Sequence, residues 1–344
     1  MPVSASLWAA TLGMNASLGL NATEMLSHRL LTSKVQHETH HSGTLCVGSH
    51  LAPSVMLIGA QRCGTGSLYE DLMTHVKGAR RGHALRGEPD FYAREQHFFA
   101  TDSWSEGVHH YLLHFPDCPH HGSDFSFAVD ATPAYLRKPI VASRLFSIYS
   151  TPVVAKLKFI IILRDPAKRL YAYWDNFVQS GTGVNNFAVW VEQTLRTVKE
   201  CQKRHGSTLW PPPDTVNCDA DDIESVAAGL YAYQLRFWFE QFDAKHFFLT
   251  SLDAYERDTA AVLRDAANFI GASRDLVGTP RAVGAPANPL AVKVLGAMPS
   301  AAKTALARFY HEHNQELLRL FNHEPHVTYS PSLKALDIQA WASP

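Results

Sequence analysis

A short apolar run that ends in a glycine-rich loop constrains the fold of this chain more than any other feature. Residues 55–58 are all apolar, residues 59–66 contain three glycines, and residues 67–73 return to helical spacing. An apolar run this short, closed by a glycine, is typical of a strand buried on both faces. The segment therefore predicts a strand, a loop and a helix.

Further strands and helices alternate along the chain. Buried strands are expected at residues 127–129, 159–163 and 247–249, and helices at about 167–179, 187–200, 226–242, 254–270 and 301–321. This alternation predicts an α/β fold, a P-loop-like parallel sheet flanked by helices on both faces. Ligands of such folds bind at the carboxyl ends of the strands, where the glycine loop and residues 130–133 and 164–166 are expected.

Length and composition are those of one large globular domain. The 344 residues are 46% hydrophobic, and 31 Lys and Arg balance 32 Asp and Glu. We expect a flexible stem or leader at 1–50, the folded domain at 51–325 and a C-terminal tail at 326–344. Because no overall basic field exists, no nucleic-acid partner is expected and any anion site must be local.

The N-terminal segment carries only weak targeting signals. Residues 2–23 lack charge, but small and polar residues interrupt the apolar ones and no Lys or Arg precedes them. The segment is a poor signal peptide and a weak membrane span, so membrane anchoring is expected either here or outside the chain. A cytoplasmic location is expected if the N-terminus is complete and is not a leader.

The glycine loop has the chemistry of an anion site. A loop that enters a helix N-terminus presents backbone N–H groups and the positive end of the helix dipole. Loops that bind nucleoside triphosphates, GxxxxGK[ST], carry a lysine after the second glycine. Here that position is Thr65, and the basic residue is Arg62. Arg62 can lie against a phosphate–sulfate bridge, with Thr65 and Ser67 donating hydroxyls. A structural turn without a ligand is the alternative.

Five segments with recognisable motifs follow one another between residues 53 and 322. They are the loop segment 55–72, REQHFF at 94–99, DATPAY at 130–135, KFIIILRDPAKRLYAYWDNF at 158–177 and the helix at 304–321. In this order they resemble the motifs of the PAPS-dependent sulfotransferases. The resemblance is closest to the Golgi carbohydrate enzymes of heparan and chondroitin type, including the N-acetylgalactosamine 4-sulfate 6-O-like ones.

The resemblance implies the sulfotransferase fold and transfer of a sulfuryl group from PAPS to a hydroxyl or amine of a carbohydrate, glycosaminoglycan-like acceptor. It also implies a location in the Golgi lumen or secretory pathway and no metal, and it leaves the oligomeric state open. The donor-binding residues that it implies are Gln61, Arg62, Cys63, Gly64, Thr65, Gly66, Ser67, Arg164, Lys168 and Ala172.

Two of these positions depart from the family pattern. Arg62 stands where most members have a lysine that contacts the bridging oxygen, and arginine keeps the charge but does not give up its proton. Ala172 stands where a serine usually bonds the 3′-phosphate, eight residues after Arg164. Lys168 or Arg169 could compensate, and Arg169 could equally be a surface or core-bridging charge.

The acceptor motif supplies the expected catalytic residues. Glu95 matches the family's general base, which removes the acceptor proton during in-line attack on sulfur. His97 and Arg94 flank it and are expected to tune it or to contact an anionic sugar. Asp130 and Thr132 are expected either to line the acceptor cleft or to cap local structure.

The cysteines and histidines suggest little else. Cys201 and Cys218 bracket a loop rich in proline that a disulfide could close, and two free thiols are the alternative. The 19 histidines cluster without CxxC or HExxH spacing, so no metal site is expected.

Two rival functions remain at this point. A catalytically weak or silent PAPS- or glycan-binding protein is suggested by Arg62 and Ala172. A P-loop nucleotide kinase is disfavoured by the missing lysine after Gly64.

Overall fold

The computed structural model describes residues 37–39, 43–120, 124–149, 151–179, 185–205, 220–280, 296–323, 327–330 and 335–341. Its centre is a six-stranded sheet in which every pair of neighbours is parallel. The strands, in spatial order, are β5 (Ala79–Arg80), β6 (Phe127–Asp130), β4 (Pro53–Gly59), β7 (Lys158–Leu163), β8 (Phe247–Ser251) and β9 (Thr328–Tyr329).

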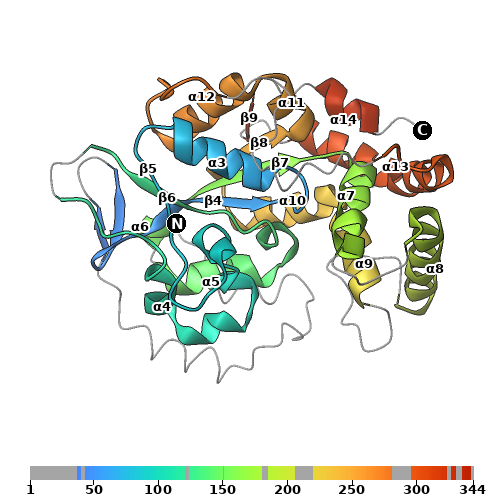
Figure 1. Cartoon of the computed structure of the whole chain (residues 1–344), viewed down its shortest axis with the longest axis horizontal. Helices are drawn as coiled ribbons and strands as arrows, with labels where there is room; N and C mark the ends of the chain where they lie inside the picture. Colours follow the sequence, from blue (N-terminus) through green and yellow to red (C-terminus); the bar gives the residue numbers. More distant parts are fainter. Residues whose placement is uncertain are drawn as a thin grey trace.

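Helices cover both faces of this sheet. Figure 1 shows α3 (Thr65–His75), α11 (Leu252–Arg257) and α12 (Thr259–Ile270) on one face and α4 (Val108–Leu112) and α5 (Ile140–Ile148) on the other. Every residue of β4 is buried, as are all of β6 and β8, because side chains on both faces of these strands pack against helices. The predicted fold class is confirmed.

A second hydrophobic core lies beside the sheet. It packs α7 (Pro166–Gln179), α8 (Phe187–His205) and α9 (Ala220–Ala227) against α13 (Ser300–His323), with Leu170, Trp190 and Leu306 among its buried side chains. Figure 1 shows these helices at one end of the molecule, beyond α10 (Tyr231–Gln241). This second core holds α7, the helix that follows β7, in place beside the sheet.

The folded part of the chain extends beyond both boundaries expected from the sequence. Before residue 51, β1 (His37–Thr39), β2 (Leu45–Val47) and β3 (His50–Leu51) form an antiparallel sheet, and Leu45 and Val47 are buried in the main core. After residue 325, β9 pairs with β8, and the helix α14 (Ala335–Trp341) packs on α13. Both ends are held by buried apolar side chains, which a composition shift does not reveal.

Several short elements connect these layers. The remaining elements are the 3₁₀ helices η1 (Asp90–Ala93), η2 (Phe98–Ala100), η3 (Asp102–Glu106), η4 (Tyr135–Arg137) and η5 (Ala244–His246), and the helix α6 (Thr151–Val154). The segment from η1 to η3 carries the motif at residues 94–99. It therefore lies between β5 and α4 along the chain, in short 3₁₀ turns rather than in a long helix or strand.

Cys46 and Cys118 form a disulfide that the sequence did not suggest. Their Cα atoms are 5.8 Å apart, and the backbone around them is already paired, since the Cys118 N–H donates to the Ser49 carbonyl at 2.7 Å. Cys201 is also disulfide-bonded, which excludes the free-thiol alternative for this residue, and the predicted partner Cys218 lies outside the described residues.

Candidate active site

The glycine loop lies at the carboxyl end of β4 and leads directly into α3. Gly64, the residue before the helix, has φ 93°, a conformation that favours glycine, and a Cβ there would approach Leu252 within 2.7 Å. No side chain caps the helix. The first-turn N–H groups of Thr65, Gly66 and Ser67 therefore have no partner within the helix and point toward the loop.

Two arginines from different strand ends meet at this loop. Arg164, which follows β7, donates from Nη1 to the Arg62 carbonyl at 3.3 Å. Partial burial and the nearby Arg164 guanidinium lower the pKa of Arg62 from its usual value. Both side chains remain cations. Their mutual repulsion is relieved by an anion, so the pair adds charge selectivity to the loop.

Arg62 also contacts the position where a serine was expected. Its Nε donates to the backbone carbonyl of Ala172 in α7 at 3.2 Å. The two departures from the family pattern are therefore neighbours in space. Nothing in their 110-residue separation along the chain indicates this contact.

The other basic residues of α7 separate into one exposed and one buried side chain. Lys168 is exposed, and its backbone N–H donates to Asp165 Oδ1 at 2.9 Å. Arg169 is fully buried, donates to the Ser225 carbonyl and lies over the Tyr173 ring at 5.7 Å. Arg169 thus fits the core-bridging alternative, and only Lys168 can reach a ligand in solvent.

Cys63 contributes to the loop through its backbone rather than its thiol. The side chain is fully buried, with Sγ 3.5 Å from the Tyr231 hydroxyl. Burial raises the pKa of this thiol to about 11. The Cys63 side chain is therefore neutral and packs in the core beneath its own loop backbone.

The acceptor motif lies against the first turn of α3. A Cβ at Gly66 would be 3.3 Å from Nη1 of Arg94, so the guanidinium packs closely on this glycine. Arg94 also holds Glu95, donating from Nη2 to Oε1 at 2.9 Å, and the other carboxylate oxygen is 3.6 Å from His97 Nε2. All three side chains are 20–28% exposed. The structure thus brings the predicted base to the anion loop.

Asp130 and Thr132 support the backbone of the acceptor motif through buried hydrogen bonds. Asp130 is fully buried and accepts hydrogen bonds from the hydroxyls of Thr132 (2.6 Å), Tyr135 (2.9 Å) and Tyr111 (3.0 Å). Thr132 Oγ1 in turn accepts the His97 N–H at 3.0 Å. Burial raises the pKa of Asp130. These contacts fit the local-structure alternative, and a role in acceptor binding stays a prediction.

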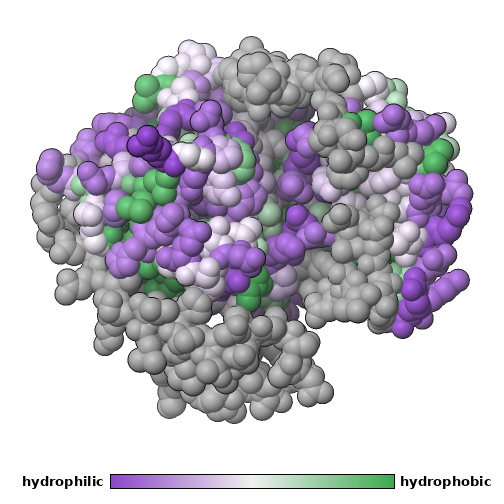
Figure 2. All heavy atoms as spheres, turned by 60° about the horizontal axis from the view of Figure 1, so that its bottom comes forward, coloured by the Kyte–Doolittle hydropathy of each residue, from purple (hydrophilic) through white to green (hydrophobic). Residues whose placement is uncertain are grey.

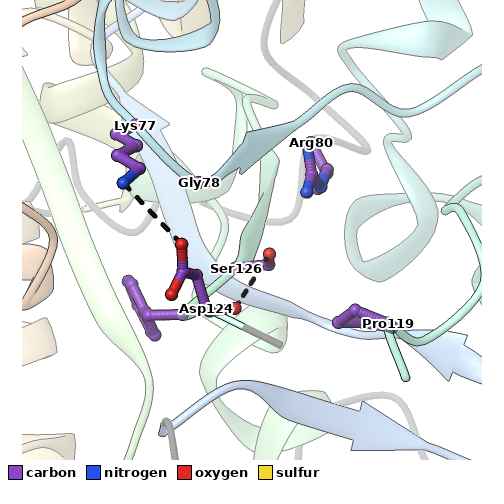
Figure 3. A pocket seen from close by; sticks show the side chains of 7 residues that line it. Lys77, Gly78, Arg80, Pro119, Asp124 and Ser126 are labelled. Atoms are coloured by element: carbon purple, nitrogen blue, oxygen red, sulfur yellow. Dashed lines mark hydrogen bonds and ion pairs between the residues drawn. The ribbon is translucent and has the colours of Figure 1, made fainter. Parts of the chain in front are cut away.

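A cavity of about 390 Å³ lies away from these residues. Lys77, Gly78, Arg80, Pro119, Asp124, Phe125 and Ser126 line it. Figure 3 shows the ion pair between Lys77 and Asp124, 3.7 Å apart, across it. These residues precede or begin β5 and β6, at the amino ends of the strands. The cavity is therefore on the opposite edge of the sheet from the loop, where ligands of such folds seldom bind.

On the face shown in Figure 2, the described residues form no large apolar patch. On the side shown in Figure 2, hydrophilic residues predominate, hydrophobic patches are small and separate, and a hollow lies near the middle. No helix in the part of the chain that the structure describes is both long and apolar enough to cross a bilayer.

Fold and site together define a class of protein: an α/β fold in which a glycine loop at a helix N-terminus is flanked by two arginines and a carboxylate, an arrangement suited to phosphate or sulfate. Comparison with protein families makes this specific, because the sulfotransferase domain matches residues 52–279. The chain therefore belongs to the sulfotransferase family. Enzymes of the family generally take the sulfuryl group from PAPS.

Individual relatives are distant. The chain is 24% identical over 286 residues to the bifunctional heparan sulfate N-deacetylase/N-sulfotransferase 4 of Mus musculus, covering 78% of this chain and 30% of that protein. A sulfotransferase from Alicyclobacillus acidocaldarius aligns with a TM-score of 0.53 and 20% identity, covering 79% of this chain and 96% of that one. The sulfotransferase domain of the Synechococcus PCC 7002 olefin synthase aligns at 0.35 and 10% identity, covering 80% and 98%.

Proposed function

We propose that this sulfotransferase moves a sulfuryl group from PAPS to a hydroxyl or amine of a carbohydrate acceptor, with Glu95 as general base. The supporting observation is the packing of Arg94 on Gly66, which brings the carboxylate of Glu95 to the N-terminus of α3. A base must lie within reach of the group that attacks the bound donor. The contacts of Arg94 with Gly66 and with Glu95 support this requirement, although the loop and the base come from separate parts of the chain.

The described residues fit the anionic donor. The N–H groups of Thr65, Gly66 and Ser67 and the guanidinium of Arg62 suit the phosphosulfate, and Arg164 suits a second phosphate because a guanidinium grips it with two N–H groups. Lys168, in the first turn of α7, adds a further exposed cation. Gln61, Cys63 and Gly64 take part through the backbone of the loop.

In the proposed step the acceptor oxygen or nitrogen attacks sulfur in line with the bond to the 5′-phosphate. The new bond to sulfur forms as the sulfur–oxygen bond to the phosphate breaks, and the acceptor proton moves to Glu95 Oε2, since Arg94 occupies Oε1. Charge grows on the leaving phosphate oxygen, where Arg62 and the helix N–H groups stabilise it. This low-basicity leaving group needs charge stabilisation rather than a proton, so arginine can replace lysine.

A glycosaminoglycan-like acceptor in an oxidising compartment is part of the proposal. The Mus musculus relative is named for an activity on heparan sulfate. Beside the base, Arg94 offers a cationic group and His97 an imidazole for hydrogen bonds with an anionic sugar. The Cys46–Cys118 disulfide is of the kind found in the secretory pathway, and it supports a Golgi location.

The test measures transfer of labelled sulfate from PAPS to a panel of desulfated glycosaminoglycans, with PAP binding followed by calorimetry. Glu95→Gln should lower kcat by roughly 10²–10⁴-fold and leave PAP affinity within about twofold of wild type. Glu312→Gln, at an 81% exposed carboxylate, is the matched control and should retain full activity. Full activity in Glu95→Gln would remove this residue from the mechanism.

One rival is favoured by a specific observation. Arg62 and Ala172 both alter donor contacts, which suits a protein that binds PAPS or glycan without turnover. Tight PAP binding by wild type with no transfer to any acceptor of the panel would establish that reading instead.

A further inference from the structure

A second cavity, of about 350 Å³, carries chemistry that sulfuryl transfer does not use. Two glutamates and two histidines line it, Glu88, Glu106, His110 and His114, together with Gln96 and several aromatic rings. Gln96 belongs to the acceptor motif, but Glu95 and His97 are not among the lining residues. The cavity is therefore next to the candidate active site and distinct from it.

Three of these residues are arranged like metal ligands. Glu88, His110 and His114 each present one ligand atom, and the three atoms lie within 4.8 Å of one another. Ligand atoms around a zinc ion with bonds of about 2.0–2.1 Å are roughly 3.3–4.2 Å apart. Small side-chain rotations would bring the three atoms onto one ion.

The two ring nitrogens of His114 both face oxygen atoms. This side chain is 4% exposed; its Nδ1 is 3.2 Å from the Tyr111 carbonyl and its Nε2 is 2.9 Å from Glu88 Oε2. A neutral imidazole has one N–H, whereas here both nitrogens face acceptors. Nε2 and the Glu88 carboxylate therefore already face each other, as two ligands of one ion would.

The second histidine is held in the same way. His110 Nε2 is 2.7 Å from Glu106 Oε2, so a carboxylate faces each imidazole. With neutral imidazoles the four side chains carry two negative charges. A single divalent cation would neutralise them, and a carboxylate on a ligating histidine is the usual way of fixing its ring.

Gln96 provides an independent sign of a ligand. Its side chain is 3% exposed, and its amide nitrogen must face the Tyr92 carbonyl, because a carbonyl only accepts. This orientation leaves Oε1 as a buried oxygen without a hydrogen-bond partner. A buried acceptor in a cavity needs a donor or a cation to offset its lost hydration.

We propose that Glu88, His110 and His114 bind a divalent transition-metal ion, zinc being the best match for two imidazoles and a carboxylate. Gln96 Oε1 completes the set directly or through a water molecule. The ion would tie the segment before η1 to α4 and so fix the backbone that carries Glu95. The site does not depend on the proposed acceptor or on turnover.

Sequence reasoning predicted no metal because it searched for known motifs. His110 and His114 are four residues apart, a spacing that places both on one side of a helical turn. The carboxylate comes from 22 residues before the first of them, with no fixed spacing. Only the fold brings the three together.

The test uses full-length protein stripped with a chelator and then titrated with zinc by calorimetry and with cobalt by absorption spectroscopy. Wild type should bind one ion per chain in this site, with the visible bands of nitrogen-ligated cobalt. His114→Ala and Glu88→Gln should each weaken zinc binding at least tenfold. His109→Ala changes an exposed neighbouring histidine and should bind as wild type does.

Two further measurements distinguish loss of the zinc site from loss of folding in these variants. His110→Ala changes a half-exposed side chain, so it should keep the native circular dichroism spectrum while losing the ion. Zinc should also raise the Tm of wild type and His109→Ala but not of the cluster variants. Equal zinc binding by all variants, or no stoichiometric binding at micromolar zinc, would overturn the proposal and leave the contact between His114 and Glu88 as a structural one.

Discussion

The contact between Arg62 and Ala172 turns two separate sequence departures into one structural feature. The Nε of Arg62 donates to the Ala172 carbonyl, which leaves both terminal nitrogens of the guanidinium for a ligand. A lysine has a single terminal nitrogen and could not serve both partners with the same geometry. We infer that arginine at 62 offsets the hydroxyl that alanine at 172 lacks.

A double-mutant cycle on PAP affinity tests this compensation. Arg62→Lys should weaken PAP binding roughly tenfold to a hundredfold, the range for a lost hydrogen bond to a charged group. Ala172→Ser should change affinity little in wild type and recover several-fold in the Arg62→Lys background. Calorimetry with the four proteins gives the coupling, and strictly additive effects would show that the two positions act independently.

At the level of elements, the strands with long apolar runs were predictable and the shortest ones were not. Strands β4, β7 and β8 are continuous runs of buried residues, so their sequence alone marks them. The strands β5 and β9 have two residues each, too few to show a period. Each forms because its backbone hydrogen-bonds with a longer neighbouring strand, β6 for β5 and β8 for β9.

Two helices predicted as continuous are each divided in the structure, one where a distant helix packs closely and one at a local cap. The expected helix at 226–242 is divided at Gly229, where a Cβ would lie 2.9 Å from the Tyr310 hydroxyl of α13. The expected helix at 254–270 is divided at Asp258, whose side chain caps α12 by accepting the Ala261 N–H at 2.9 Å. The second break has a sequence signal, an N-cap aspartate, but the first depends on a distant helix.

The sequence indicated which residues to expect at the candidate site but not their contacts. Glycine spacing and strand ends indicated the loop and Arg164, because both follow from local pattern. The packing of Arg94 on Gly66 and the three hydroxyls on Asp130 depend on how separate segments meet. The pairing of Cys46 with Cys118 was likewise not determined by the positions of five cysteines.

We expect the Cys46–Cys118 disulfide to contribute strongly to the free energy of unfolding. It closes a loop across a sequence separation of 72 residues, for which chain entropy gives about 4 kcal/mol. Cys46→Ala with Cys118→Ala should therefore lower the urea midpoint markedly, measured without reductant. Ser49→Ala, an exposed change beside the bridge, should leave the midpoint unchanged. An unaltered midpoint in the double variant would show that the hydrogen bonds between residues 49–51 and 116–118 suffice.

The molecule as a whole buries an unusual set of weak acids around its site. Burial raises the pKa of Cys63 to about 11 and that of Tyr310 to about 12, and it also raises the pKa values of Tyr111, Tyr135 and Tyr231. Each of these groups is neutral in the folded state at neutral pH. Their ionisation in the unfolded chain begins first, since exposed thiols and phenols ionise at lower pH.

Stability should consequently fall at alkaline pH before any buried group ionises in the native protein. For a group that loses its proton, a raised folded pKa means that the folded state binds more protons between the two pKa values, so the free energy of unfolding decreases as pH rises. For Cys63 this pH window runs from its ordinary pKa of 9.0 to about 11, and the free energy of unfolding falls by roughly 2–3 kcal/mol at its upper end.

Urea unfolding at pH 8, 9, 10 and 11, with short exposures and a check of refolding to exclude thiol–disulfide exchange, should show this decline. Cys63→Ala should have a shallower decline over the same range, because it lacks the thiol but keeps the tyrosines. Parallel curves for the two proteins would mean that Cys63 is open to solvent and that its thiol, contrary to the structure, is available to react.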